Sequence, residues 1–224
     1  MVVLLMITIK LKYLCFILII VLTQMNFVGC GYAHNFSTAA KLSIPAVGVV
    51  YTDGAVSTGF FVSSEGAFIT NLHVLQDTEH CSVKIHSGEF FGIKEIISVY
   101  PECDLALLQV DIDSREVHAL PISSRIPQVG EEIIVIGAPH GLEYSVTTGV
   151  ISAIRDIDLM GRVYQISAPI YPGSSGSPVL SMSGKLLGVA FLTLSGGDNL
   201  NFAIPASKVH SLISNELNKK KTTK

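Results

Sequence analysis

The sequence predicts an all-β protein made of two antiparallel β-barrels with six strands each, followed by a short C-terminal helix. Three observations lead to this prediction. Beyond residue 40, the chain of 224 residues breaks into short apolar segments. Turn-forming sequences such as Thr52-Asp53-Gly54 and Ser63-Ser64-Glu65-Gly66 separate them, which is typical of β-hairpins. The segments also form two halves of similar size, each large enough for a barrel.

Twelve segments are expected to be strands. The N-terminal barrel is predicted over 41–120, with strands at 44–51, 57–62, 67–70, 83–86, 90–99 and 105–110. The C-terminal barrel and the helix are predicted over 121–218, with strands at 132–137, 148–154, 163–167, 178–180, 186–194 and 201–204. Val209, Leu212 and Ile213 recur at helical spacing after Pro205, so we expect a helix over 206–217 and a solvated basic tail over 219–224.

The charge balance excludes one broad class of partner. Lys and Arg total 15 against 18 Asp and Glu, a net charge of −3, so nothing indicates nucleic-acid binding. Hydrophobic residues make up 49% of the chain, and part of this excess lies at the N-terminus. There Lys10 and Lys12 precede the apolar run 13–22, which is built like a secretory signal and is short for a membrane span.

The N-terminal segment ends in Phe27-Val28-Gly29-Cys30, which resembles a bacterial lipobox. We therefore predict a lipoprotein-type signal peptide over 1–29, lipidation of Cys30 and a tether over 30–40. A lipid would hold the protein on a membrane surface without spanning it. Ordinary cleavage near Ala33 and an uncleaved anchor over 2–22 remain alternatives, and all three imply export to the periplasm or the cell surface.

Two cysteines, Cys81 and Cys103, remain beyond the N-terminal segment. In an oxidising compartment they could form a disulfide, or they could be two buried free thiols, and the sequence does not decide between these. A zinc site built from these thiols with His80 and His86 lacks the usual ligand spacings. No metal ion or other cofactor is expected.

The stretch PGSSGSPV at 172–179 predicts a tight loop, because glycine and proline mark unusual backbone geometry. On its own it fits a serine-rich surface turn equally well. His73 follows a short predicted strand, and Asp104 precedes the apolar strand 105–110. Taken separately, His73 fits a packed core histidine and Asp104 fits a cap at the start of a strand.

Together these residues have a chemical logic. A serine hydroxyl needs a base to become a nucleophile, and an imidazole works near neutral pH. A desolvated carboxylate, here Asp104, would orient the imidazole of His73. Among the serines, Ser175 fits the nucleophile best because it stands two residues after Gly173 and directly before Gly176.

The same loop is expected to supply the oxyanion donors, which are the backbone N–H groups of Gly173 and Ser175. Ser174 is a weaker candidate nucleophile because no glycine stands two residues before it. Ser177 is weaker because Pro178 follows it and favours an extended backbone.

Several motifs resemble the trypsin-like serine proteases of the HtrA kind. They are TGFFV at 58–62, TNLHV at 70–74, DLALL at 104–108, IGAPHGL at 136–142, VTTGVIS at 146–152, PGSSGSPV at 172–179 and NFAIP at 201–205. The resemblance covers roughly residues 41 to 210 and keeps the family order of histidine, aspartate and serine. It implies a chymotrypsin-like fold with the site in the cleft between the barrels. It also implies a serine endopeptidase that cleaves polypeptides through an acyl-enzyme, in protein quality control or processing.

The sequence departs from the family pattern in two ways. The usual loop Gly-Asn-Ser-Gly-Gly-Pro is here Gly-Ser-Ser-Gly-Ser-Pro, which raises the question whether Ser177 occupies a position that needs an unusual dihedral angle. The sequence also leaves no room for a PDZ domain after the predicted barrels.

The resemblance carries two further expectations. It places Ala190, Phe191 and Leu192 at the primary specificity pocket, where the uncharged stretch 168–170 favours small or medium apolar side chains over Lys or Arg. A family-like trimer would use Tyr32 and Phe36, which fit a flexible tether equally well. The rival function is a non-catalytic or latent binding or adhesion protein with the same fold.

Overall fold

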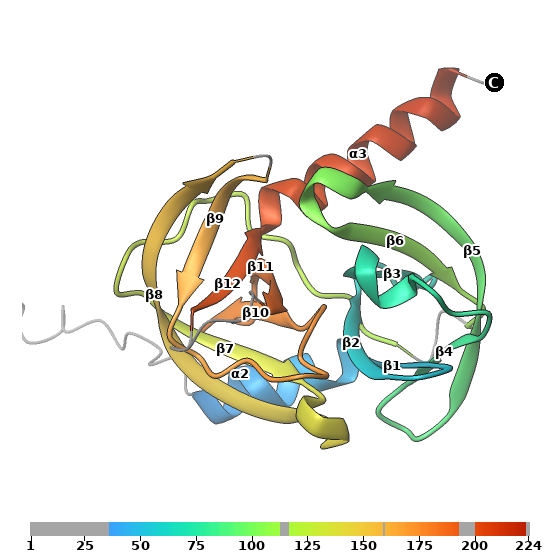
Figure 1. Ribbon diagram of the computed structural model, residues 1–224, viewed down its shortest axis with the longest axis horizontal. Helices are drawn as coiled ribbons and strands as arrows, with labels where there is room; N and C mark the ends of the chain where they lie inside the picture. Colours follow the sequence, from blue (N-terminus) through green and yellow to red (C-terminus); the bar gives the residue numbers. More distant parts are fainter. Residues whose placement is uncertain (1–35, 113–116, 159, 193–199, 223–224) are drawn as a thin grey trace, which may run out of the picture. The chain divides into compact units, whose positions relative to one another are not determined.

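The computed structural model describes residues 36–112, 117–158, 160–192 and 200–222 (Figure 1). All of them belong to one compact unit of the chain. The predicted signal peptide, Cys30 and Tyr32 lie outside the described residues.

The twelve strands form two closed antiparallel barrels, which lie side by side in Figure 1. The first has the order β1-β2-β3-β6-β5-β4, with β1 Val47–Thr52, β2 Val56–Phe61, β3 Ala67–Asn71, β4 Cys81–Lys84, β5 Phe90–Tyr100 and β6 Leu105–Val110. The second has the order β10-β11-β12-β9-β8-β7, with β7 Glu132–Gly137, β8 Ser145–Ile157, β9 Gly161–Ile166, β10 Pro178–Ser181, β11 Leu186–Leu192 and β12 Asn201–Pro205. The predicted fold class is confirmed.

The helices differ from the sequence prediction at both ends. Helix α3 (Ala206–Thr222) continues past residue 217 because no glycine or proline stops it. Helix α2 (Phe36–Ser43) occupies part of the predicted tether, and Phe36 packs partly buried against the core. The 3₁₀ turn η1 (Ile44–Ala46), with Pro45 at its start, delays the first strand to Val47.

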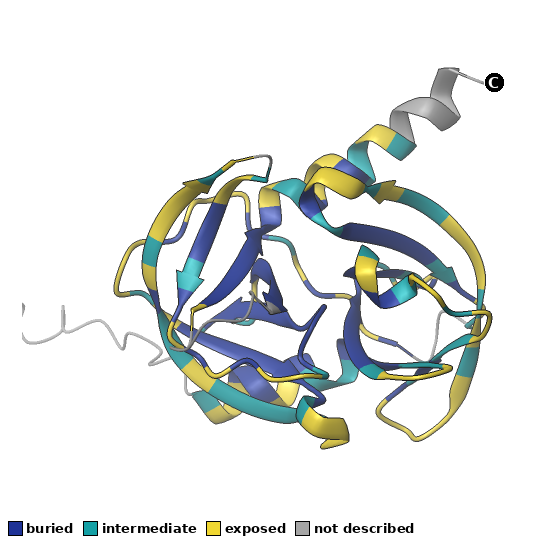
Figure 2. Ribbon diagram, viewed as in Figure 1, coloured by how far each residue is buried: buried dark blue, intermediate teal, exposed yellow. Residues whose placement is uncertain are grey.

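Successive side chains along a strand point to opposite faces of the sheet. The two barrels therefore have three hydrophobic cores, one inside each barrel and one between them. In β6, Ala106 and Leu108 face the interior of the first barrel, whereas Leu105 and Leu107 join a core shared between the barrels. In β7, likewise, the shared core receives Ile134 and Ile136, and the second barrel's interior receives Ile133 and Val135. Figure 2 shows this burial along the facing strands. Burial of each Leu, Ile or Val side chain among these stabilises the fold by about 1.5–3 kcal/mol.

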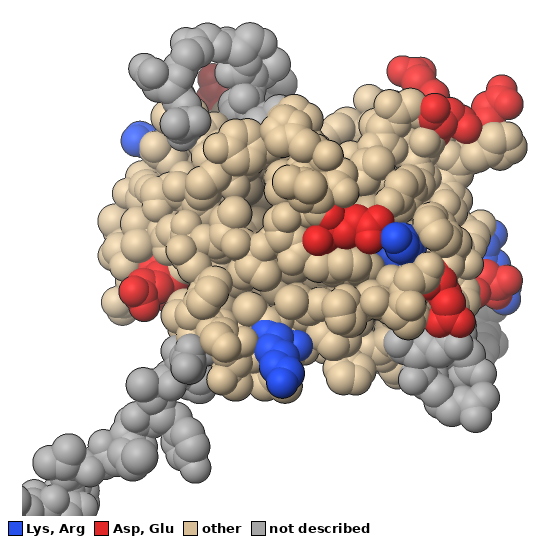
Figure 3. All heavy atoms as spheres, turned by 90° about the horizontal axis from the view of Figure 1, so that it is seen from below, with Lys and Arg blue, Asp and Glu red and all other residues tan. Residues whose placement is uncertain are grey.

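Few features outside the core suggest a special site. Cys81 and Cys103 are free thiols, and no group of three or more His, Cys, Asp or Glu side chains within the described residues could hold a metal ion. No helix in the described part of the chain is long and apolar enough to cross a membrane. On the face shown in Figure 3, acidic and basic side chains are scattered over a mostly uncharged surface.

Candidate active site

His73 and Asp104 form a two-point contact in the first barrel. His73 lies in the 3₁₀ turn η2 (Leu72–Leu75), directly after β3. Its backbone N–H donates to Asp104 Oδ1 at 2.8 Å, and its Nδ1 lies 2.6 Å from Asp104 Oδ2. The His73 side chain is 44% exposed, so it is not a core histidine. The Asp104 side chain is 26% exposed, less desolvated than expected, and its carboxylate contacts His73 instead of capping β6.

The backbone of Asp104 is held in a left-handed conformation, with φ at 50°. It stands between the 3₁₀ turn η3 (Pro101–Cys103) and β6. Its carbonyl oxygen accepts hydrogen bonds from the Leu72 N–H at 3.1 Å and from Asn71 Nδ2 at 2.9 Å. Aspartate tolerates this conformation better than most residues. These bonds fix the carboxylate relative to the imidazole.

The loop between β9 and β10 depends on two glycines. Gly173 and Gly176 have φ values of 96° and 84°. A Cβ on Gly173 would lie 2.2 Å from the Ala138 carbonyl oxygen, and one on Gly176 would lie 2.0 Å from the Thr58 carbonyl oxygen. Both positions therefore exclude larger residues. Ser177, by contrast, has no positive φ, so serine there does not strain the backbone.

The three serines of this loop have different surroundings. Ser174 Oγ accepts a hydrogen bond from the Tyr171 N–H at 3.3 Å and supports the turn. Ser177 is fully buried, and its hydroxyl has no hydrogen-bond partner among the described residues. Ser175 as a whole residue is 7% exposed. Its hydroxyl makes no hydrogen bond with any described residue, the His73 imidazole included. Of the three serines, Ser175 is thus the one whose hydroxyl neither supports the turn nor is fully buried.

Two backbone N–H groups of the loop are also uncommitted. Ser174, Gly176 and Ser177 donate to the carbonyls of Tyr171, Ala190 and Ser174 at 2.8, 3.0 and 3.0 Å. Neither Gly173 nor Ser175 donates its N–H to any acceptor within the described residues. The N–H groups of Ser174, Gly176 and Ser177 are therefore used within the fold, whereas those of Gly173 and Ser175 are available to an external acceptor.

Thr58 in β2 joins this loop to the first barrel. Its N–H donates to the Ser175 carbonyl at 3.0 Å, and its hydroxyl donates to the Gly173 carbonyl at 2.8 Å. The same hydroxyl accepts the Ala138 N–H at 3.0 Å. In the sequence, Thr58 is part of the TGFFV motif and no role was predicted for it. Thr58 is completely buried, and a buried hydroxyl of this kind needs hydrogen-bond partners, but the sequence carries no signal for which partners it finds.

The residues expected at the specificity pocket lie beside the loop. Ala190 and Phe191 are buried, and Leu192 ends β11. The Ala190 carbonyl accepts a hydrogen bond from the Gly176 N–H, and the Ala190 N–H donates to the Ser177 carbonyl at 2.8 Å. Strand β11 therefore holds the backbone of the loop. Phe191 stacks on Phe202 with ring centroids 6.1 Å apart. No charged side chain comes from this stretch.

The two closed barrels define the chymotrypsin-like class of fold, here with a His–Asp pair on one barrel and a glycine-serine loop on the other. Residues 57–189 match the family described as the trypsin-like peptidase domain. The chain belongs to this family, and its relatives place it with the HtrA-type serine proteases.

Curated relatives include probable periplasmic serine endoproteases described as DegP-like. That of Chlamydia trachomatis is 35% identical over 69% of this chain and 32% of its own length. That of Bartonella henselae is 36% identical over 71% of this chain and 33% of its own length. The chain thus spans about a third of the curated relatives it matches. The crystal structure of a serine endoprotease from Yersinia pestis is 28% identical, with a TM-score of 0.73 over 82% of this chain and 67% of that one.

Proposed function

We propose that this protein is an exported serine endopeptidase that hydrolyses polypeptides through an acyl-enzyme. The observation that carries the proposal is the state of the 172–177 loop, where the Ser175 hydroxyl and the N–H groups of Gly173 and Ser175 have no hydrogen-bond partner among the described residues. A nucleophile and two oxyanion donors are the groups that acyl transfer needs together.

In the proposed mechanism, Ser175 Oγ attacks the scissile carbonyl carbon while His73 Nε2 takes its proton. Asp104 keeps the proton of His73 on Nδ1 and stabilises the imidazolium that forms. The N–H groups of Gly173 and Ser175 donate to the oxyanion of the tetrahedral intermediate. His73 then gives its proton to the leaving amine. Water next attacks the acyl carbon while His73 takes one of its protons, and His73 returns that proton to Ser175 Oγ as the acyl group leaves. Hydrogen bonds between such groups often tighten only when substrate is bound.

Substrate preference and location complete the proposal. Ala168, Ile170 and Ala190 are uncharged and buried, which supports cleavage after small or medium apolar residues. The relatives are named periplasmic, which supports export of this chain to the periplasm. Lipidation of Cys30, membrane attachment, a trimer and a role in quality control or processing are further parts of the proposal.

The rival function is a binding or adhesion protein with an idle or latent site. Membership of a peptidase family and the two-point contact between His73 and Asp104 favour catalysis over this alternative. A binding protein has no need for both an imidazole fixed by a carboxylate and a serine hydroxyl in the 172–177 loop that no described residue hydrogen-bonds.

Cleavage of casein and of short apolar peptides tests the proposal. The Ser175→Ala variant should lose all activity above background. Ser183→Ala is the matched control, since Ser183 is an exposed serine in the turn after β10. Equal activity of the wild type and Ser175→Ala in a clean preparation would reject the assignment.

A further inference from the structure

Residues 138–145, which we name the connecting segment, join β7 to β8 and contact the first barrel near their C-terminal end. Lys84 Nζ donates hydrogen bonds to both carboxylate oxygens of Glu143, each at 2.9 Å. The Tyr51 hydroxyl donates a further hydrogen bond to the same carboxylate. The Tyr144 hydroxyl donates to the Lys84 carbonyl at 3.1 Å. Lys84 lies in β4 and Tyr51 in the adjacent strand β1. The second barrel is thereby anchored on the first.

Lys84 and Glu143 form an ion pair at this contact between the barrels. The side chains of Lys84 and Glu143 are 24% and 23% exposed, which reduces their screening by solvent. The hydrogen bond to Glu143 raises the pKa of the Tyr51 hydroxyl to about 12. The Tyr51 hydroxyl and Lys84 in turn lower the pKa of Glu143 below its usual value, so this carboxylate is charged at neutral pH.

The other end of the connecting segment contacts the nucleophile loop. The His140 N–H donates to the Pro172 carbonyl at 2.7 Å, and the His140 and Tyr171 rings lie 5.5 Å apart. The Pro172 carbonyl and the Gly173 N–H belong to one planar trans peptide, so they point in opposite directions. Holding this carbonyl toward His140 therefore aims the Gly173 N–H away from the connecting segment, as an oxyanion donor requires.

The backbone between these two ends is short and closely bonded. His140 and Tyr144 have φ values of 53° and 57°, a conformation that is costly for residues other than glycine. Gly141 donates to the Ala138 carbonyl at 3.0 Å, Leu142 to the Pro139 carbonyl at 2.9 Å, and Ser145 Oγ to the Leu142 carbonyl at 2.6 Å. Because of these hydrogen bonds, we expect that a shift of the Glu143 backbone would also shift the backbone of His140.

We propose that Glu143 and Lys84 are positioning residues that set the direction of the Gly173 N–H through His140. The proposal rests on the proposed protease function and adds a pair of residues to it. Because these residues act on the oxyanion donor and not on the substrate, their loss should lower kcat and leave KM nearly unchanged.

The test compares Glu143→Ala and Lys84→Met with the wild type in peptide hydrolysis and in inhibition by a peptide boronic acid, which forms a tetrahedral adduct with a nucleophilic serine. Both variants should lower kcat about tenfold and weaken inhibition about tenfold, with KM changed less than about twofold. Glu143→Gln keeps a hydrogen-bond acceptor and should recover about a third of the wild-type kcat. Because the two side chains act as one unit, the double variant should be no worse than either single variant.

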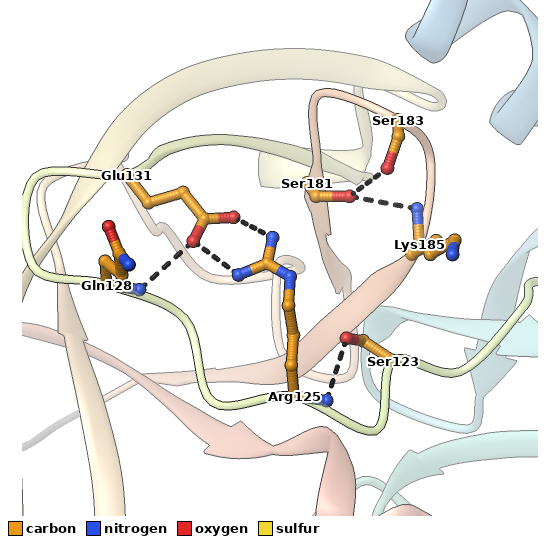
Figure 4. Close-up of polar contacts among 7 residues, drawn as sticks. All are labelled: Ser123, Arg125, Gln128, Glu131, Ser181, Ser183 and Lys185. Carbon is orange, nitrogen blue, oxygen red and sulfur yellow. Dashed lines mark hydrogen bonds and ion pairs between the residues drawn. The ribbon is translucent and has the colours of Figure 1, made fainter.

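The matched control is a different ion pair, formed by Arg125 and Glu131. Arg125 Nη1 donates to Glu131 Oε2 at 2.7 Å, and the Gln128 N–H donates to the same oxygen at 3.1 Å (Figure 4). Glu131 makes no hydrogen bond or ion pair with the nucleophile loop among the described residues. Glu131→Gln should therefore leave kcat and boronic acid inhibition unchanged.

Amide hydrogen exchange followed by mass spectrometry separates this inference from the proposed function, because it needs no activity. In Glu143→Ala, peptides covering 138–145 and 171–177 should exchange at least about fivefold faster than in the wild type, and those of Glu131→Gln should not. Unchanged exchange in these peptides overturns the inference even if the protein is inactive. Normal kcat and normal inhibition of Glu143→Ala in an active protein also overturn it, and leave the proposed function standing.

Discussion

The backbone N–H of Thr58 donates a hydrogen bond to the carbonyl oxygen of Ser175 at 3.0 Å. This bond connects β2 of the first barrel to the candidate nucleophile of the second. The Thr58 carbonyl in turn accepts the hydroxyl of Thr70 at 2.7 Å, and β3, which contains Thr70, leads directly to His73. The candidate base and the candidate nucleophile thus share one buried support, although they come from different barrels.

Replacing Thr58 by valine should harm both stability and activity. The change keeps the shape of the side chain but leaves the Gly173 carbonyl and the Ala138 N–H without their buried partner. We expect a loss of about 1–3 kcal/mol in the free energy of unfolding, measured by urea denaturation. We also expect kcat for peptide hydrolysis to fall about tenfold. Thr58→Ser keeps the hydroxyl and should stay close to the wild type. A stable, fully active Thr58→Val protein would disprove the role of this hydroxyl.

Replacing Asp104 by asparagine should remove most of the activity without unfolding the protein. An amide cannot accept from both the backbone N–H and Nδ1–H of His73 while stabilising an imidazolium. We expect kcat/KM to fall on the order of 10³–10⁴-fold, measured with a chromogenic peptide. Asp111→Asn, at the far end of the strand that follows Asp104, is the control and should have no effect. A loss of less than about tenfold would mean that Asp104 does not orient the base.

Ser177→Ala should make the protein more stable. The Ser177 hydroxyl is buried against Gly137 and lacks a hydrogen-bond partner among the described residues, which is unfavourable. Removing it should raise the free energy of unfolding by about 1 kcal/mol in chemical denaturation. A less stable variant would show instead that the hydroxyl has a favourable partner.

Cys81 should react slowly with iodoacetamide although it is only partly buried. Burial, and secondarily the negative charge of Asp53, raise the pKa of the Cys81 thiol to about 11 from a usual value of 9.0. The reactive thiolate is then about a hundredfold scarcer at pH 8 than in a thiol with the usual pKa. Mass spectrometry should show slow alkylation in the folded protein and ordinary alkylation in 6 M urea or guanidinium, on the order of the concentrations that unfold small domains. Rapid alkylation of the folded protein would contradict this account.

Much of the fold could be predicted from the sequence because turn residues and apolar segments alternate so regularly. Helix α2 was missed because only eight residues, including Ser37 and Thr38, form it, and its buried face depends on tertiary contacts. The end of α3 was placed too early because the change to lysines at 219–221 looked like a solvated tail, although lysine is a good helix former.

The candidate site was predictable only in part. His73, Asp104 and Ser175 could be chosen because their chemistry demands those residue types, and Gly173 because a tight loop needs glycine. The contacts of Thr58 and of Glu143 could not be predicted, because they join segments that are 115 and 59 residues apart along the chain. Only the packing of the two barrels brings those segments together.

Labelling with a fluorophosphonate probe, followed by peptide mapping, shows whether Ser175 is an activated nucleophile, since such probes form a covalent bond with an activated serine. We expect one label per protein, attached to Ser175, and no labelling of Ser175→Ala. Labelling that is absent from the folded wild type, or that falls on Ser174 or Ser177 instead, would contradict this expectation.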